Sequence, residues 1–340
     1  MERKYDVITL GEILLRLSTP INGRLAEGDT LMRHLGGAEL NIASEIGQLG
    51  LKTAIISKIP GNLLSAFIRN QLNASRVSES YLISDTGADS RIGIYYYEYG
   101  SYPRKPRVVY DRKHSSINSI DIQDVPETMF YNTRLFHTSG ITLGLGGNAQ
   151  SFAIDCIRKF KEQGTLISFD VNYRANLWSG EEARACIESI LPYVDIFFCS
   201  ADTARLTFGK TGTIEEIQKS FCKEYPISVV ASTERTVITP KKHDFTSVLY
   251  SSRADRYYRE QPYRSIDVVD RIGSGDAYVS GALYGYLKHH DCQKMLEYGN
   301  AMAAIKHSVI GDMISTDIEE IDSIIAQHQD TSEFQAEMNR

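Results

Sequence analysis

The chain has 340 residues, of which 42% are hydrophobic and 24% are charged, a composition that is ordinary for a soluble globular protein with a sizeable core. A net charge of −6 gives no indication of non-specific binding to nucleic acid or to a membrane surface. No apolar run approaches the roughly 18 residues that a membrane-spanning helix needs, and no signal-peptide pattern precedes the first strand-like run. The five cysteines include no CxxC pair, so we expect buried free thiols in a cytoplasmic protein.

Strand-like runs alternate with helical patterns along most of the chain. Short apolar runs predict strands at 6–10, 54–57, 135–138, 166–170, 196–199, 228–231 and 266–269. Apolar residues at helical spacing predict helices at 39–49, 63–72, 153–161, 181–191, 214–222, 276–289, 293–308 and 318–326. This alternation predicts an α/β fold with a mostly parallel sheet, helices on both faces, and ligands beyond the carboxyl ends of the strands.

One segment departs from the alternation. Residues 91–99 and 106–112 predict two strands around a turn, a β hairpin that would close over a site and exclude water. Alternation places Tyr95, Tyr97 and Tyr99 on one face of the first strand. Aromatic residues also favour strands for packing alone, so a core or dimer contact explains this face equally well.

Two pairs of glycines precede predicted helices. Gly36 and Gly37 come before a helix that contains Asn41, whose amide can bind sugar hydroxyls, although such a pair is often only a turn. Gly273 and Gly275 flank a helix start that Asp276 opens. Free N–H groups at such a start bind anions, and a carboxylate there can accept a proton from an attacking hydroxyl; an Asp N-cap in a tight turn is the plain alternative.

Two further polar groups follow predicted elements. Asp170, Asn172 and Arg174 come at the carboxyl end of a buried strand, where Arg can grip a carboxylate or phosphate or simply lie on the surface. Gly311 and Asp312 follow the helix at 293–308, a position that is also typical of a helix end and turn.

The two glycine motifs, Gly-Gly-x-x-x-Asn at 36–41 and Gly-x-Gly-Asp at 273–276, resemble in this order the signatures of the PfkB (ribokinase-like) carbohydrate kinases. The Asp-x-Asn-x-Arg pattern followed by Leu177-Trp178, the hairpin, and the string from Lys306 to Asp312 resemble the 2-keto-3-deoxygluconate (KDG) kinase branch. The resemblance implies a ribokinase-like three-layer α/β/α core with a small β-sheet lid. It also implies a single kinase domain over 1–328, with the lid drawn from about 12–35 and 90–115, and a polar tail at 329–340.

By the same resemblance, the protein is an ATP-dependent sugar kinase that uses Mg²⁺ and phosphorylates the terminal hydroxyl of a keto sugar acid, KDG above all, to give the 6-phosphate. Catalysis is assigned to Asp276 with Gly273, Ser274 and Gly275. The expected substrate contacts are Gly37, Asn41, Tyr95, Tyr110, Arg112, Arg174 and Asp312. The expected nucleotide contacts are Asn172, Thr233, Gly273, Gly275 and Asn300. A homodimer through the lid, or a higher homo-oligomer, is compatible with the aromatic hairpin.

Several positions depart from the family pattern. Arg271 and Ile272 replace a Thr pair, and Ser200-Ala-Asp202-Thr203 replaces an Asn-x-x-Glu element that helps to place magnesium, so no metal ligand is assigned. The loop after Ala231 lacks the common Gly-x-x-Gly. Fructokinase or another PfkB sugar kinase, and a catalytically weak sugar-binding relative, therefore remain alternatives. An NAD-dependent oxidoreductase is disfavoured, because no GxGxxG loop is present.

Overall fold

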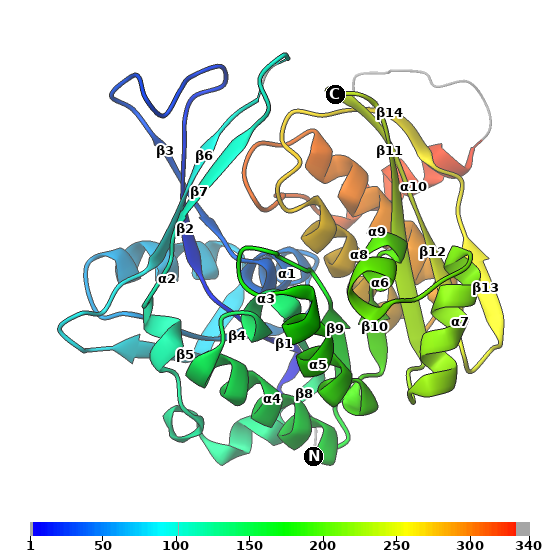
Figure 1. Ribbon diagram of the computed structural model, residues 1–340, viewed down its shortest axis with the longest axis horizontal. Coiled ribbons are helices and arrows are strands. Elements are labelled where there is room, and N and C mark those ends of the chain that lie inside the picture. Colours follow the sequence, from blue (N-terminus) through cyan, green and yellow to red (C-terminus); the bar gives the residue numbers. More distant parts are fainter. Residues whose placement is uncertain (1–2, 101, 331–340) are drawn as a thin grey trace.

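A ten-stranded sheet forms the centre of the protein in the computed structural model, which describes residues 3–100 and 102–330 (Figure 1). Seven strands are parallel neighbours in the order β5 (Val77–Asp85), β4 (Thr53–Pro60), β1 (Tyr5–Leu10), β8 (Thr133–Ser139), β9 (Leu166–Asp170), β10 (Ile196–Phe198) and β11 (Val229–Thr239). Three antiparallel strands extend this sheet beyond β11: β12 (Lys242–Ser251), β13 (Arg256–Arg259) and β14 (Tyr263–Asp267). The prediction of a mostly parallel sheet is confirmed.

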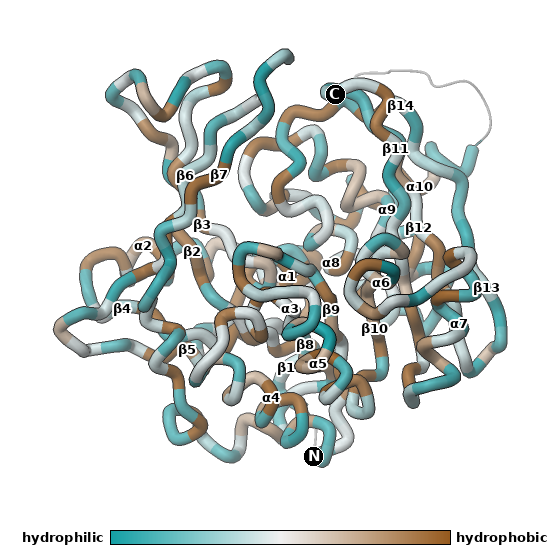
Figure 2. Tube along the Cα trace, viewed as in Figure 1, coloured by the Kyte–Doolittle hydropathy of each residue, from teal (hydrophilic) through white to brown (hydrophobic). Residues whose placement is uncertain are grey.

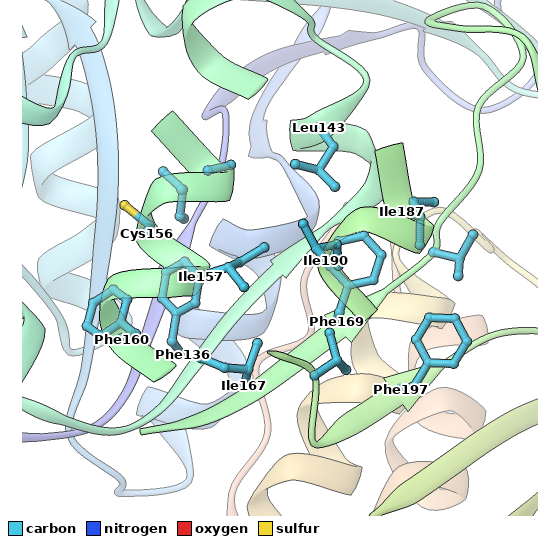
Figure 3. Packing of buried hydrophobic residues seen from close by; sticks show 14 of the residues in the cluster. Phe136, Leu143, Cys156, Ile157, Phe160, Ile167, Phe169, Ile187, Ile190 and Phe197 are labelled. Atoms are coloured by element: carbon cyan, nitrogen blue, oxygen red, sulfur yellow. The ribbon is translucent and has the colours of Figure 1, made fainter. Parts of the chain in front are cut away.

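Helices cover both faces of the sheet. One face packs against α4 (Gly147–Glu162), α5 (Gly180–Ile190), α6 (Ala201–Phe208) and α7 (Ile214–Glu224), in a cluster that includes Phe136, Phe169 and Phe197 (Figure 3). The other face packs against α1 (Ala38–Gln48), α2 (Leu64–Ala74), α8 (Ser274–His289) and α9 (Cys292–His307), with α10 (Ile318–Gln329) against α9. A short α3 (Gly140–Leu143) follows β8. The inner parallel strands β1, β4, β8, β9 and β10 are buried along almost their whole length, because helices cover both sides of the sheet there.

The helices form where apolar residues recur at helical spacing. In α4, Phe152, Cys156 and Phe160 are buried and fall on one stripe that contacts the sheet. Figure 2 shows hydrophobic and hydrophilic residues interspersed along α4, whereas most residues of α1, α8 and α9 are buried. All five cysteines are free thiols, as predicted; Cys156 and Cys199 are buried and the others are half-buried.

A separate four-stranded sheet stands beside the core, in the order β3 (Met32–Gly36), β2 (Leu14–Ser18), β6 (Gly93–Glu98) and β7 (Arg107–Asp111) (Figure 1). Its β6–β7 pair is antiparallel, which confirms the predicted hairpin, while β2 and β6 are parallel. One face packs on α1 and α2 through Leu15 and Leu35. Tyr95 and Tyr97 lie on the opposite face. We call this sheet the lid.

Some boundaries differ from the sequence predictions. β11 runs to Thr239 rather than to 231, because its exposed outer half pairs with β12 as a two-stranded ribbon that carries little apolar signal. The strand expected at 266–269 lies at Tyr263–Asp267. Most of the polar tail expected at 329–340 lies outside the described residues, and the division into one domain and a tail stays a prediction. No helix in the described part of the chain is long and apolar enough to cross a membrane.

Candidate active site

A cavity of about 460 Å³ lies between the lid and the carboxyl ends of the core strands. Most of the predicted site residues line it: Gly37, Asn41, Tyr95, Tyr110, Arg112, Asn172, Arg174, Gly273, Ser274, Gly275, Asp276 and Asp312. They come from lid strands, from the start of α1, from the end of β9 and from the start of α8. The fold therefore gathers segments from the whole length of the chain at one edge of the sheet, as expected for an open α/β sheet.

Asp276 lies in the first turn of α8 and faces this cavity. The Asn41 side-chain amide donates to its Oδ2 at 2.7 Å, and the Asn172 amide lies 3.5 Å from its Oδ1. Burial raises the pKa of Asp276 to about 6, against the opposing effects of the Asn41 hydrogen bond and the Arg174 charge. The carboxyl group is therefore ionised at neutral pH and can accept a proton, with a pKa near the range that suits a general base.

Residues 271–275 form the loop before Asp276 at the start of α8, and we call them the anion loop because their backbone donors suit an anion. Gly273 has φ +82°, and a Cβ there would lie 1.9 Å from the carbonyl oxygen of Asp312, so only glycine fits. The N–H of Ser274 donates to the carbonyl of Arg271 at 3.2 Å and closes a turn. The N–H groups of Gly275 and Asp276 have no backbone acceptor among the described residues. These two donors at a helix N-terminus are suited to binding a phosphoryl group.

The start of α1 forms the wall facing Asp276. Gly37 has φ +124°, and a Cβ there would lie 2.2 Å from the carbonyl oxygen of Glu12. The buried Oδ1 of Asn41 has no hydrogen-bond partner among the described residues, so it is free to accept from a ligand hydroxyl. Glu39, which the sequence analysis did not single out, is buried and accepts from Ser139 and Thr142 at 2.7 and 2.8 Å. Burial raises the pKa of Glu39. An acidic residue at the start of an otherwise apolar helix was the sequence feature that could have identified it.

The lid supplies a cation that is held in place by an acid. Nε of Arg112 donates to Oε2 of Glu12 at 2.8 Å, its Nη2 also donates to Glu12, and Ser115 donates to the other oxygen of that carboxylate. Nη1 of Arg112 forms no hydrogen bond within the described residues. Tyr110 is exposed, with its ring 5.8 Å from that of buried Tyr95. Sequence reasoning named Arg112 and both tyrosines but missed Glu12, whose partner is 100 residues away.

A second cavity of about 210 Å³ adjoins the first and shares Asn172, Arg174 and Gly275 with it. Asp170 and Thr233 line this second cavity. Burial, and then the charge of Asp276, raise the pKa of Asp170 to about 7.

Two residues considered for the nucleotide side lie elsewhere. Asn300 is fully buried and lines neither cavity; its amide donates to Glu260 at 2.7 Å and accepts from Ser247 at 2.8 Å. Asp202, which lies one position away from where the family's Glu would stand, pairs with Arg205 at 3.3 Å. Within residues 3–100 and 102–330, no three His, Cys, Asp or Glu side chains are grouped to hold a metal ion.

Three arginines give the mouth of the main cavity a positive charge. Arg174, Arg235 and Arg271 line it, and none forms an ion pair with the described residues. Burial, and then the charge of Arg271, lower the pKa of Arg235. Uncompensated guanidinium groups beside a helix N-terminus suit a ligand with several negative charges.

Comparison with known proteins gives the family. The sequence pattern of the pfkB family carbohydrate kinases matches residues 4–319. The chain belongs to this family. It is therefore a sugar kinase, an enzyme that transfers a phosphoryl group to an alcohol group of a carbohydrate, and the oxidoreductase alternative is excluded.

Similar proteins indicate which branch of the family the chain resembles. A 2-dehydro-3-deoxygalactonokinase of Haloferax volcanii is 30% identical over 94% of this chain and 96% of its own length. A 2-dehydro-3-deoxygluconokinase of Bacillus subtilis is 26% identical over 91% of this chain and 92% of its own. The crystal structure of 2-dehydro-3-deoxygluconokinase from Thermotoga maritima superposes with a TM-score of 0.89 at 30% identity, covering 96% of this chain and all of the other. The resemblance to the KDG kinase branch and to the ribokinase-like fold is confirmed.

Proposed function

We propose that this PfkB kinase transfers the γ-phosphoryl group of ATP to the terminal hydroxyl of a 2-keto-3-deoxy sugar acid, and that KDG is converted to its 6-phosphate. One observation carries the proposal: an ionisable carboxylate, Asp276, and two unpartnered N–H groups share one cavity with the lid cation Arg112. Base, anion site and acid-binding group are thus arranged around a space that suits a six-carbon acid.

The reaction follows from this arrangement. Asp276 accepts the proton of the terminal hydroxyl while that oxygen forms a bond to the γ-phosphorus and the bond to the leaving ADP breaks. The N–H groups of Gly275 and Asp276 stabilise the charge on the transferred group. Asn41 holds Oδ2 of the carboxylate and leaves Oδ1 for the proton.

The acid end of the substrate would lie against the lid. Arg112 is the lid cation that reaches the cavity, and Glu12 fixes its guanidinium plane so that Nη1 and the Tyr110 hydroxyl can bind a carboxylate. Asn41 Oδ1 accepts from a sugar hydroxyl. A neutral ketose such as fructose has no carboxylate to accept from the free Nη1 of Arg112, which favours a sugar acid over the fructokinase alternative.

The nucleotide would extend from the main cavity into the second one. Arg174, Arg235 and Arg271 offset phosphate charge, Asn172 and Thr233 line the path, and we assign Asn300 no nucleotide contact. Mg²⁺ is commonly held by one or two carboxylates together with nucleotide phosphates. Asp170 fits this role, because its buried carboxyl group lines the second cavity. The ion would neutralise phosphate charge.

The compartment and the oligomeric state follow from other features. Free thiols fit a reducing cytoplasm. The exposed edge strand β7 supports a homodimer, which light scattering would detect.

A coupled ADP-release assay tests the proposal. The purified chain is given Mg-ATP with KDG, 2-keto-3-deoxygalactonate, 5-keto-2-deoxygluconate or fructose, and Asp276→Asn is run beside it. We expect the largest kcat/KM with a 2-keto-3-deoxy acid, and loss of turnover in the variant. A preference for fructose would overturn the substrate assignment, whereas sugar binding by calorimetry without ADP release would indicate a catalytically weak relative.

A further inference from the structure

Among the described residues, Arg16 is the largest fully buried side chain, and it lies on lid strand β2. The sequence analysis did not single it out. Its Nη1 donates to Oδ1 of Asp312 at 2.8 Å, and its Nη2 donates to Oδ2 of Asp270 at 2.6 Å and to the Tyr99 hydroxyl at 3.0 Å. The guanidinium also stacks on the ring of Tyr97, 4.5 Å from its centre. Nη1 and Nη2 of Arg16 are paired with the two acids, whereas its buried Nε has no hydrogen-bond partner among the described residues. Because a buried cation is costly without such pairing, the geometry of the two ion pairs is tightly specified.

Both acids that Arg16 binds contact the anion loop. Oδ1 of Asp270 accepts from the N–H of Ile272 at 3.0 Å, and its Oδ2 accepts from the N–H of Gly311 at 3.2 Å. Asp270 therefore fixes the segment that enters the loop. The backbone of Asp312 packs directly on Gly273, with no space for even one added carbon atom. A displacement of either acid moves the loop that presents the N–H groups next to Asp276.

The lid reaches the same acids from three strands. Arg16 of β2 is paired across the sheet with His34 of β3 and Tyr95 of β6. The Tyr95 hydroxyl donates to Oδ2 of Asp312. Gly36 packs so closely on that oxygen that a Cβ would lie 2.2 Å away. The inner face of the lid is therefore joined to the anion loop by buried polar groups.

The charges in this contact are balanced within the protein. Lys306 is also buried, and its Nζ donates to the carbonyl oxygens of Asp270 and Val309 at 3.0 and 2.8 Å. Arg16 binds the carboxylates of Asp270 and Asp312, whereas Lys306 binds backbone carbonyl oxygens beside them. Hydrogen-bonded buried charges hold one geometry much more strictly than apolar packing does, because the alternative is an unpaired buried charge. The contact between Arg16 and the two acids can therefore form in only one position of the lid.

We propose that Arg16 is a positioning residue that couples the seating of the lid over the sugar to the geometry of the anion loop. The inference rests on the proposed function. With the lid seated, Arg16 holds Asp270 and Asp312 so that the loop donors face the transferred phosphoryl group. Sugar binding and nucleotide binding then favour the same arrangement, and each ligand tightens the other by the same factor.

A binding cycle separates this role from that of a simple strut. Calorimetry measures the affinity of the full chain for the non-hydrolysable analogue AMP-PNP with Mg²⁺, with and without saturating KDG. We expect KDG to tighten AMP-PNP binding by about fivefold or more in the wild type, within the usual range for coupled sites. In Arg16→Gln the change should fall to within about twofold, with kcat reduced by about tenfold to a hundredfold.

Two further variants complete the test. Arg33→Met removes an exposed lid arginine of β3 that stacks on Phe67, and it should leave coupling and kcat unchanged. Arg16→Lys keeps the positive charge but cannot bridge two carboxylates as a planar fork does, so it should fall between wild type and Arg16→Gln. If Arg16→Gln does not fold, Arg16→Lys carries the test.

The outcomes are distinguishable from a failure of the proposed function. An active wild type together with Arg16 variants that keep full coupling and kcat would overturn this inference alone. A wild type that releases no ADP with any sugar would overturn the proposed function and the inference with it. A lower melting temperature in Arg16→Gln, with the coupling between KDG and AMP-PNP binding intact, would show that Arg16 only stabilises the fold. That result would also refute the positioning role.

Discussion

The hydrogen bond from Asn41 to Asp276 makes a quantitative prediction about pH. The donor stabilises the ionised carboxylate at 2.7 Å, so its removal should raise the pKa of Asp276 above its present value of about 6. A hydrogen bond to a charged group is worth about 1.5–3 kcal/mol, and one pKa unit corresponds to about 1.4 kcal/mol. Asn41→Ala should therefore shift the pKa by about 1–2 units upward.

Asn172 provides the matched control, because its amide lies at 3.5 Å from the other oxygen of the same carboxylate, the limit of a hydrogen bond. The acid limb of kcat/KM against pH reports the pKa in the free enzyme. We expect that limb to move to higher pH in Asn41→Ala and to move much less in Asn172→Ala. Because Asn41 also lines the sugar site, its loss can lower kcat/KM at every pH. The test is therefore the pH at the midpoint of the acid limb, not the height of the profile. A midpoint in Asn41→Ala that stays in place or moves to lower pH would refute the reasoning.

Three further predictions concern buried charges. Asp276→Asn should lower kcat by about 10²-fold or more. It should nevertheless raise thermal stability at pH 8, because burial raises the pKa of this carboxyl group and its ionisation therefore destabilises the fold above pH 6. Equal melting curves for the variant and the wild type at pH 8 would contradict this. Burial likewise raises the pKa of Glu45 to about 8. Wild-type stability should therefore fall as pH rises from the ordinary Glu value towards 8, and urea titrations of Glu45→Gln should show a weaker dependence with kcat unchanged. Arg112→Met leaves Glu12 buried without its partner and should cost about 3–5 kcal/mol; adding Glu12→Gln should restore stability but not the KM for the sugar acid, and recovery of KM would rule out the substrate contact.

The sequence predicted the elements in which apolar residues recur at a regular helical spacing or form a short continuous run. α4 is long and buries one regular stripe, and β1 and β9 are short runs rich in apolar residues, so local patterns were enough. β12 and β13 mix polar and apolar residues at a sheet edge. Their strand character comes from pairing with β11 and with each other rather than from their own composition, and the sequence predicted neither.

What the sequence determined by itself is the set of local conformations that only certain residues adopt. Gly273 and Gly37 occupy positive φ where a Cβ would collide with backbone, so these motifs are legible without any knowledge of the fold. The tertiary structure alone decided which charged side chains meet. Arg16 binds Asp312 across 296 positions and Asn41 binds Asp276 across 235, because strand register and layer packing bring them together. Charge pairing depends on distances in space that no local pattern encodes. The sequence therefore pointed to Asp276 and Asn41 as site residues, but it predicted neither the hydrogen bond between them nor the contacts of Arg16.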